Sequence, residues 1–314
     1  MSSPSSTQNT GNDTNPRRPT RSLKGRVAIV TGAGSRSTGI GNGRASAILL
    51  AESGCAVVCA DLNLSWASQT VSMITSEFGV TLDEEGFKSK PRAIAVQADV
   101  SSEEDCQRVV RTAVETYGRL DILVNNVGVA GPVGTAVEVS KRDWERGMEV
   151  NVTGMVLMAK YAVPAMERNA RDDVSGRGTI VNMSSVAGLV GGNPMLLYPT
   201  SKGAIVNLTR AMAAHHAGSG IRVNCVCPGM LYTPMLYSGG MSEETREARR
   251  KRSILQTEGN GWDAGLAVRF LASDEARWIT GVILPVDAGY TAAPHGGAEE
   301  NKVLTKTLMV SSKL

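Results

Sequence analysis

The chain carries near its start the stretch Arg26-Val-Ala-Ile-Val-Thr31-Gly-Ala-Gly-Ser-Arg-Ser-Thr-Gly-Ile-Gly41, an apolar run followed by a glycine-rich turn. A short apolar run of this kind predicts a buried strand. The Ala- and Leu-rich segment 42–53 predicts a helix, which Gly54 ends. Glycine lets the backbone of such a turn approach a pyrophosphate, and the helix N-terminus supplies N–H donors. The stretch therefore predicts a strand, a turn and a helix that together bind a dinucleotide.

A second apolar run, 55–61, predicts the next strand and ends in Asp61, 20 residues beyond Gly41 (61 − 41 = 20). A carboxylate at the end of this strand accepts hydrogen bonds from an adenosine ribose and repels a 2′-phosphate. Arg36, inside the turn, is the opposing signal, because a cation there can bind a 2′-phosphate. Direct repulsion at the ribose outweighs one arginine, so NAD(H) is the expected cofactor and NADP(H) is the alternative.

Apolar runs alternate with helical patterns along the rest of the chain. Further strands are predicted at 93–97, 120–125, 178–183, 221–226 and 282–286, and further helices at 65–78, 102–117, 141–169, 198–217 and 263–272. This alternation is typical of β-α-β units with a sheet that is buried on both faces. The sequence therefore predicts an α/β fold: a doubly wound (Rossmann) seven-stranded parallel sheet flanked by helices on both faces, in a single domain.

The two ends of the chain differ from its middle. Residues 1–24 are rich in Ser, Thr, Asn, Pro and Arg and lack an apolar core, which predicts a disordered N-terminal tail and excludes a secretory signal peptide. Three arginines in this segment leave a transit peptide as a minor alternative: Arg17, Arg18 and Arg21. The folded domain is expected over 25–290, and a C-terminal extension over 291–314.

Composition excludes several functional classes. A formal net charge of +3 on 314 residues is too small to indicate nucleic-acid binding. No apolar run approaches the ~18 residues of a membrane-spanning helix. The five cysteines form no C-x-x-C pair, and neither histidines nor carboxylates cluster, so neither a disulfide framework nor a metal site is expected. These features predict a cytoplasmic protein that acts on a small molecule.

The stretch Tyr198-Pro-Thr-Ser-Lys202 places a phenol and an ammonium on one face of a predicted helix. A tyrosine hydroxyl titrates at about pH 10, and a nearby lysine charge favours its phenolate form. A tyrosine tuned in this way can take a proton from an alcohol or give one to a ketone oxygen. A Tyr and a Lys at this spacing are common by chance. A predicted dinucleotide site in the same chain favours a catalytic role for this pair.

With these motifs the chain resembles the short-chain dehydrogenase/reductase family over about residues 24–290. Each motif is weak alone, and their occurrence in the family's order makes the set specific. The matching segments are Thr31-Gly32…Gly39-Ile40-Gly41, Asp99-Val100, Asn125-Asn126-Val127-Gly128, Asn151-Val-Thr-Gly154, Ser184-Ser185, the pair Tyr198 and Lys202, and Pro228-Gly229-Met-Leu231-Tyr-Thr233.

The resemblance implies a role for each catalytic residue. Tyr198 is implied as the acid/base, and Lys202 as the group that lowers its pKa and holds the nicotinamide ribose. Ser185 is implied as the hydrogen-bond partner of the substrate oxygen, since it lies 13 positions before Tyr198 (198 − 13 = 185), as the family's serine does. Asn151 is implied to hold a water between Lys202 and bulk solvent.

The resemblance also implies a set of cofactor contacts, which runs from the glycine turn to the segment after the sixth strand. They are Gly32, Ser35, Arg36, Gly39, Ile40, Gly41, Asp61, Asp99, Val100, Asn126, Val127, Gly128, Tyr198, Lys202, Pro228, Gly229, Leu231 and Thr233.

The glycine turn departs from the family pattern. Six residues separate Gly32 from Gly39 where the family usually has three, an insertion of three (6 − 3 = 3). Because of the insertion, the family pattern does not determine which residues contact the cofactor phosphates. Arg36 and Ser37 become candidates for lining the cofactor cleft.

Apolar residues flank the predicted site, and no Arg or Lys is among them, which argues against an anionic group on the substrate. The expected reaction is hydride transfer between the cofactor and a hydrophobic, including cyclic, secondary alcohol or ketone. An isomerase, lyase or epimerase on the same site is the alternative, and the intact Ser185, Tyr198 and Lys202 argue against a non-catalytic binding protein. The substrate-lining candidates are Val190, Met195, Leu196, Leu197, Met230, Leu231, Tyr232, Met235, Leu236 and Tyr237.

Two expectations concern assembly and motion. The helical segments 141–169 and 198–217 carry many small and apolar residues, and the family resemblance implies a homodimer or homotetramer through them. The segment 230–261 is expected to be a lid over the substrate, with Gly239-Gly240 as its hinge.

Overall fold

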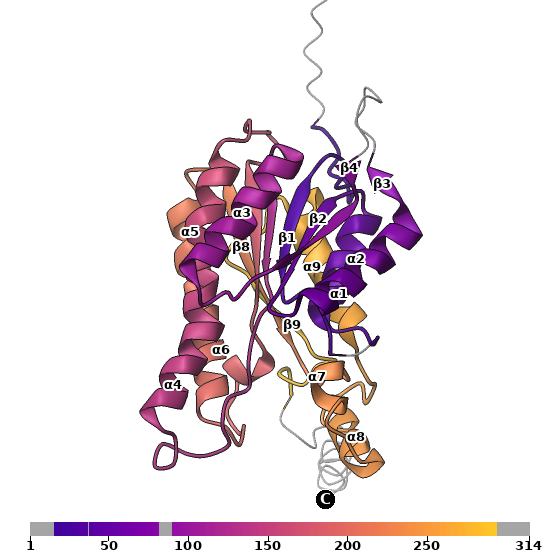
Figure 1. Ribbon diagram of the computed structural model, residues 1–314. Helices are drawn as coiled ribbons and strands as arrows, with labels where there is room; N and C mark the ends of the chain where they lie inside the picture. Colours follow the sequence, from indigo (N-terminus) through magenta and orange to yellow (C-terminus); the bar gives the residue numbers. More distant parts are fainter. Residues whose placement is uncertain (1–15, 37, 82–89, 294–314) are drawn as a thin grey trace, which may run out of the picture.

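The computed structural model describes residues 16–36, 38–81 and 90–293. Within these residues, seven parallel strands form one sheet in the order β5-β2-β1-β6-β7-β8-β9 (Figure 1). The predicted α/β fold with a doubly wound seven-stranded parallel sheet is confirmed. The strands are β1 Val27–Thr31, β2 Ala56–Asp61, β5 Ala93–Gln97, β6 Ile122–Asn125, β7 Gly178–Met183, β8 Ile221–Pro228 and β9 Ile283–Val286.

Helices cover both faces of this sheet (Figure 1). One face packs in a buried aliphatic cluster against α1 (Asn42–Glu52), α2 (Leu64–Phe78) and α9 (Gly261–Ala272). The other face packs against α3 (Glu103–Tyr117), α5 (Gly154–Glu167) and α6 (Leu197–His216). Three further helices lie toward the carboxyl ends of the strands: α4 (Lys141–Met148), α7 (Pro234–Tyr237) and α8 (Glu243–Arg250).

Polar caps explain where several helices begin. The Ser102 side chain accepts a hydrogen bond from Asp105 N at the start of α3, and Asn63 accepts one from Trp66 N at the start of α2. At α9, Asn260 and Asp263 form a reciprocal capping box. Such caps satisfy N–H groups that lack a partner within the helix, so local sequence sets these boundaries.

The strand order creates a crevice between β1 and β6. The chain runs outward from β1 to β2 and β5, and then returns to place β6 against the other side of β1. Helices that follow the two halves therefore leave on opposite faces of the sheet. Ligands of doubly wound sheets bind at the carboxyl ends of the strands at such a switch point.

Three local features differ from the sequence-based expectation. The helical path over 141–169 contains a π-helical turn, Glu149–Thr153, between α4 and α5. A short antiparallel pair, β3 (Val80–Thr81) and β4 (Lys90–Pro91), lies in the polar connection 79–92. Leu23, assigned to the tail, is fully buried, and its N–H donates to Ser53 O (2.7 Å). The remaining predictions for 1–15 and 294–314 lie outside the described residues.

Candidate active site

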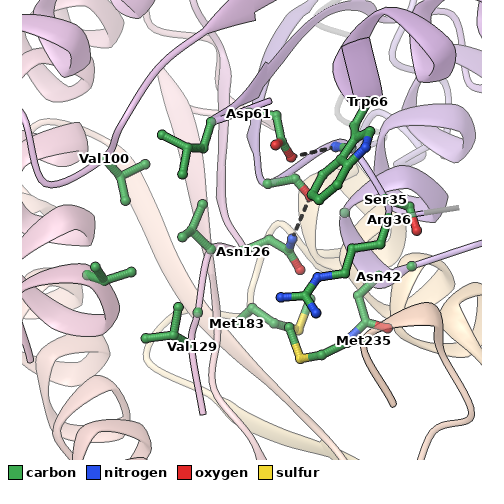
Figure 2. A pocket seen from close by; sticks show the side chains of 18 of the residues that line it. Ser35, Arg36, Asn42, Asp61, Trp66, Val100, Asn126, Val129, Met183 and Met235 are labelled. Atoms are coloured by element: carbon green, nitrogen blue, oxygen red, sulfur yellow. Dashed lines mark hydrogen bonds between the residues drawn. The ribbon is translucent and has the colours of Figure 1, made fainter. Parts of the chain in front are cut away.

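A cavity of about 400 Å³ opens at the switch point of the sheet (Figure 2). Its wall brings together thirteen of the eighteen expected cofactor contacts, counted within the described residues, from the glycine turn to α6 and α7. These are Gly32, Ser35, Arg36, Gly41, Asp61, Asp99, Val100, Asn126, Val127, Gly128, Tyr198, Lys202 and Thr233. Residues distant in the sequence therefore line one continuous space.

Three of the predicted catalytic side chains gather where β7 ends and α6 begins. Lys202 is 3% exposed, and its Nζ donates to Met183 O (3.0 Å) and lies 5.7 Å from the centroid of the Tyr198 ring. Ser185 follows β7, and its hydroxyl is hydrogen-bonded to the side chain of Tyr198. The neighbouring Ser184 instead donates to Lys202 O (2.7 Å) and is buried. Ser184 is nevertheless the one of the two that lines the cavity, so the choice of Ser185 stays a prediction.

Burial dominates the electrostatics of this cluster. It raises the pKa of Tyr198, and the hydrogen bond with Ser185 offsets only part of this effect. Burial also lowers the pKa of Lys202 to about 8, with the nearby thiols of Cys225 and Cys227 opposing it. The expected lowering of the Tyr198 pKa by Lys202 is therefore not present in the protein alone. The physical reason is that desolvation penalises the phenolate, while Lys202 Nζ bonds the Met183 carbonyl.

Asn151 lies in the π-helical turn and is fully buried. Its Oδ1 accepts from Val129 N (2.7 Å), and its Nδ2 donates to Val129 O and Ser201 Oγ (both 2.9 Å). A Cβ on Gly128 would lie 3.0 Å from Lys202 Nζ and 3.6 Å from Asn151 Oδ1. Asn151 thus ties the loop after β6 to α6 beside Lys202, and π turns frequently mark such functional positions. Its implied role in holding a water stays a prediction.

The glycine turn uses a different glycine from the one expected. Helix α1 begins at Asn42, with Gly41 as its N-cap. A Cβ on Gly43 would lie 2.0 Å from Gly32 O, so Gly43 lets α1 pack against the end of β1. Asn42 and Gly43 line the cavity, and the sequence analysis missed both. The available signal was Gly41-Asn-Gly43, which repeats the Gly-x-Gly spacing immediately before the alanine-rich helix.

Two expected contacts in the turn, Gly39 and Ile40, lie away from the cavity wall. Gly39 O accepts a hydrogen bond from the buried guanidinium of Arg44 (2.8 Å), and Ile40 packs against the core on the α1 face. The insertion is thus longer than inferred, because the helix starts one Gly-x-Gly unit later. Ser37, the other candidate in the insertion, lies outside the described residues.

Asp61 is fixed beside the turn at the end of β2. Its Oδ2 accepts from Gly34 N and its Oδ1 accepts from Asn63 N (both 2.9 Å). Gly34 is required here, because a Cβ on it would lie 2.6 Å from Trp66 Cβ and 2.8 Å from Asp61 Oδ2. The carboxylate, 9% exposed, lines the cavity. The turn therefore holds a negative charge where the second strand meets the cavity.

Asp99 and Val100 line the same cavity as Asp61. Burial favours a higher pKa for Asp99, but hydrogen bonds from Ser101 and Arg146 outweigh it and lower the pKa. Arg146 NH2 lies 3.4 Å from Asp99 Oδ2, and its NH1 donates to Ser101 Oγ (2.9 Å). Asp99 is therefore an ionised, fixed acceptor near neutral pH.

The segment after β8 only partly meets the expectation. Thr233 and Met235 line the cavity, while Pro228 and Gly229 do not. Leu231 and Met230 line a separate hollow of about 260 Å³. A Cβ on Gly229 would lie 2.7 Å from Asp287 Cα, so this glycine serves close packing of the chain.

The substrate-lining candidates are likewise divided. Met235 lines the large cavity, whereas Leu197 is fully buried against Gly131 and Gly147. Tyr232 stacks on Tyr237 with ring centroids 4.8 Å apart. Periodicity indicates which side chains are apolar, but tertiary packing decides whether they meet core, cavity or one another.

Comparison with known proteins identifies the family. A family model described as Enoyl-(Acyl carrier protein) reductase matches residues 34–291. The meso-2,3-butanediol dehydrogenase of Serratia marcescens is 36% identical, over 85% of this chain and 95% of that protein. The cis-4-hydroxycyclohexanecarboxylate dehydrogenase of Sinomonas cyclohexanicum is 37% identical, over 85% and 97%.

Solved structures agree with this result. A protein from Burkholderia xenovorans, described as a short-chain dehydrogenase/reductase, has a TM-score of 0.76 and 35% identity over 87% of this chain and 98% of that one. A 7α-hydroxysteroid dehydrogenase complexed with NADH and 7-oxo glycochenodeoxycholic acid has a TM-score of 0.74 and 31% identity, over 86% and 95%. The chain belongs to the short-chain dehydrogenase/reductase family. It is accordingly an oxidoreductase that acts on CH–OH groups with a nicotinamide cofactor.

Two properties of the described residues concern membrane spanning and metal binding. In residues 16–36, 38–81 and 90–293, no helix combines the length and apolar character that a membrane span requires. The same part of the chain holds no group of three His, Cys, Asp or Glu side chains arranged to bind a metal ion.

Proposed function

We propose that the protein is an NAD-dependent dehydrogenase that interconverts hydrophobic secondary alcohols and their ketones. The observation that carries the proposal is the position of Tyr198 and Lys202 at the cavity that the glycine turn and Asp61 also border, with Ser185 hydrogen-bonded to the Tyr198 side chain. An acid/base group beside a dinucleotide cradle matches the needs of this reaction, which removes a hydride and a proton from an alcohol or adds both to a ketone.

The residues of the cavity fit a nicotinamide dinucleotide. Gly34 and Gly43 leave no room for a Cβ against the rest of the protein, so the backbone of the turn packs closely and lines the cavity without intervening side chains at these two positions. When bound, the cofactor supplies the group that accepts or donates the hydride. The protein's own residues must then bind the alcohol oxygen and move its proton.

Tyr198 performs the proton step in this proposal. Its hydroxyl takes the proton from the alcohol oxygen in oxidation and returns it to the ketone oxygen in reduction, while Ser185 donates a hydrogen bond to that same oxygen. Lys202, whose pKa is about 8, exchanges a proton at Nζ near neutral pH. Because the pKa of Tyr198 is raised, its hydroxyl stays protonated at neutral pH. Reduction should therefore be favoured there, and oxidation should accelerate as pH rises.

Asp61 is proposed to select NAD over NADP. Its carboxylate is held by Gly34 N and Asn63 N, so a 2′-phosphate at the ribose would meet a fixed negative charge. The test is kcat/KM with NADH and NADPH, for the wild-type protein and for Asp61→Asn, which keeps an acceptor and removes the charge. A preference for NADH that shrinks in the variant is expected. A wild-type preference for NADPH would overturn the assignment.

The proposed substrate is hydrophobic and includes cyclic alcohols. Apolar side chains line the cavity that Tyr198 also lines, among them Val129, Met183 and Met235, and one similar dehydrogenase is named for a cyclohexane derivative. A panel of cyclic and acyclic secondary alcohols, followed by NADH absorbance, tests the proposal. Net NADH formation distinguishes an oxidoreductase from an isomerase, lyase or epimerase, which would give none.

Assembly through the helical segments 141–169 and 198–217 remains a proposal. The exposed Val156 on α5 offers apolar surface for such a contact. Light scattering at micromolar concentration should give the mass of a homodimer or homotetramer, and a monomer would contradict the proposal.

A further inference from the structure

The inserted part of the glycine turn is anchored at both ends. Before it, Ser35 is 7% exposed and Gly34 packs against Trp66 and Asp61. After it, Gly39 O accepts from the buried Arg44 guanidinium (2.8 Å). Ile40 O lies where a Cβ on Gly261 would approach to 2.6 Å, so α9 also abuts the turn. Arg36, the first of the three residues between Ser35 and Gly39, thus follows directly on an anchored position.

Arg36 differs from the other cations of the cavity wall. Arg146 is paired with Asp99 and Ser101, and Lys202 is buried with its Nζ on Met183 O. Among the residues that the structure describes, no hydrogen bond or ion pair is found for the exposed Arg36 side chain. Its charge is therefore available to a ligand of the cavity.

The Arg36 side chain extends into the cavity toward the start of α1. Figure 2 shows the guanidinium on the side of Asn42 and Met235, away from Asp61. A 2′-phosphate at the adenosine ribose would lie beside Asp61, so this direction does not favour a 2′-phosphate contact. The guanidinium instead faces the part of the cavity beside the start of α1.

The start of α1 supplies a second anion-binding feature in the same region. The helix has no acidic residue in its first turn and no side-chain cap on its N-terminal amides. A Cβ on the N-cap Gly41 would meet only Ser35 Oγ, at 3.7 Å, so the approach to these amides is open. Free N–H groups and the helix dipole favour a negative group here, and the Arg36 guanidinium faces that space.

Resting on the function proposed above, we infer that Arg36 is a cofactor-binding residue whose guanidinium binds the pyrophosphate of the dinucleotide. The inserted loop holds the guanidinium over one side of the pyrophosphate, while the amides of α1 approach the other. Guanidinium groups suit this task, because their N–H donors pair with phosphate oxygens in charge-assisted hydrogen bonds. The insertion thereby adds a side-chain contact to a cradle otherwise made of backbone.

Binding constants of cofactor fragments test this inference. Quenching of Trp66, which lines the cavity, reports NADH binding, and calorimetry reports ADP-ribose and adenosine. For Arg36→Ala we expect the Kd of NADH and of ADP-ribose to rise about tenfold, the equivalent of ~1.4 kcal/mol, while that of adenosine changes by less than about twofold. Arg36→Lys should recover part of the loss, and Thr38→Ala, in the same loop, should bind all three ligands like the wild type.

Three results would overturn the inference. If Arg36→Ala weakened the binding of NADPH alone, Arg36 would contact the 2′-phosphate and not the pyrophosphate. An equal loss for adenosine would mean that the variant disturbs the loop. Unchanged binding of every ligand would show that the guanidinium makes no contact. A wild-type protein that binds ADP-ribose but oxidises no alcohol would contradict the proposed function and leave the pyrophosphate contact standing.

Discussion

Replacing Lys202 with methionine should make the protein more stable while abolishing its activity. The pKa of this buried lysine falls from 10.5 to about 8, a difference of about 2.5 units, and each unit corresponds to about 1.4 kcal/mol. Keeping the charge in the folded protein at pH 7 therefore costs about 3 kcal/mol. Methionine removes the charge and fills a similar volume. The lost hydrogen bond to Met183 O offsets about 1 kcal/mol, which leaves a gain of about 2 kcal/mol.

The gain in stability of Lys202→Met over the wild type should decrease as the pH rises. Because the folded pKa lies below the unfolded one, the penalty on the wild type is complete below about pH 8 and fades as pH rises toward 10.5. Thermal unfolding at pH 7 should show Lys202→Met melting roughly 4 °C higher. That difference should shrink at pH 10.

A matched control is Lys160→Met. This lysine is 56% exposed and is paired with Glu103, so its replacement should give no gain in Tm at either pH. A variant at Lys202 that melts at or below the wild-type temperature at pH 7, with no dependence on pH, would refute the reasoning. It would mean that the lysine is not held charged in a desolvated position.

Three further predictions follow from the site. Tyr198→Phe should lower kcat by at least about 100-fold, with NADH binding retained in fluorescence titration; near-normal turnover would contradict the mechanism. Gly43→Ala should lower the free energy of unfolding in urea by about 1–3 kcal/mol, because the added Cβ would meet Gly32 O at 2.0 Å. Gly41→Ala is the control and should lower that free energy by less. Equal losses would contradict the assignment of Gly43 as the glycine that packs α1 against β1. Arg246→Ala should accelerate hydrogen exchange over α8, since the Arg246 side chain binds Glu258 (2.6 Å) and lies 4.1 Å from the centroid of the Tyr232 ring. Lys251→Ala is the control and should change the exchange less. Unchanged exchange in Arg246→Ala would show that these contacts do not hold α8 in place.

The contacts of Arg246 also bear on the predicted lid. The sequence predicted a lid over 230–261, and α8 lies within it. The structure ties that segment to the chain before α9 through Glu258, whose pKa is lowered by the hydrogen bond from Arg246. Gly240, with a φ of 84°, still provides the flexible position before α8. Closure of the segment therefore remains a prediction that the exchange experiment addresses.

Local pattern predicted most of the fold. Strands of β-branched and small residues such as Val27–Thr31 fit only a sheet that is buried on both faces, and the helices between them begin at caps such as Ser102 and Asn260. Spacing likewise predicted that Tyr198 and Lys202 share one helix face. The Gly-x-Gly motif was ambiguous, because two overlapping copies satisfy the same local pattern and only the contact with Gly32 O tells them apart.

The sequence by itself determined the class of fold, the order of its strands along the chain and the residue types of the candidate site, because short-range periodicity and spacing encode them. Only the tertiary structure decided that Gly43 packs against β1, that Leu231 lines a separate hollow, and that burial raises the pKa of Tyr198. The physical reason is that close packing and desolvation depend on atoms from distant parts of the chain. The direction of the Arg36 side chain was also decided only by the tertiary structure, because contacts with α1 and α9 hold the loop that carries it.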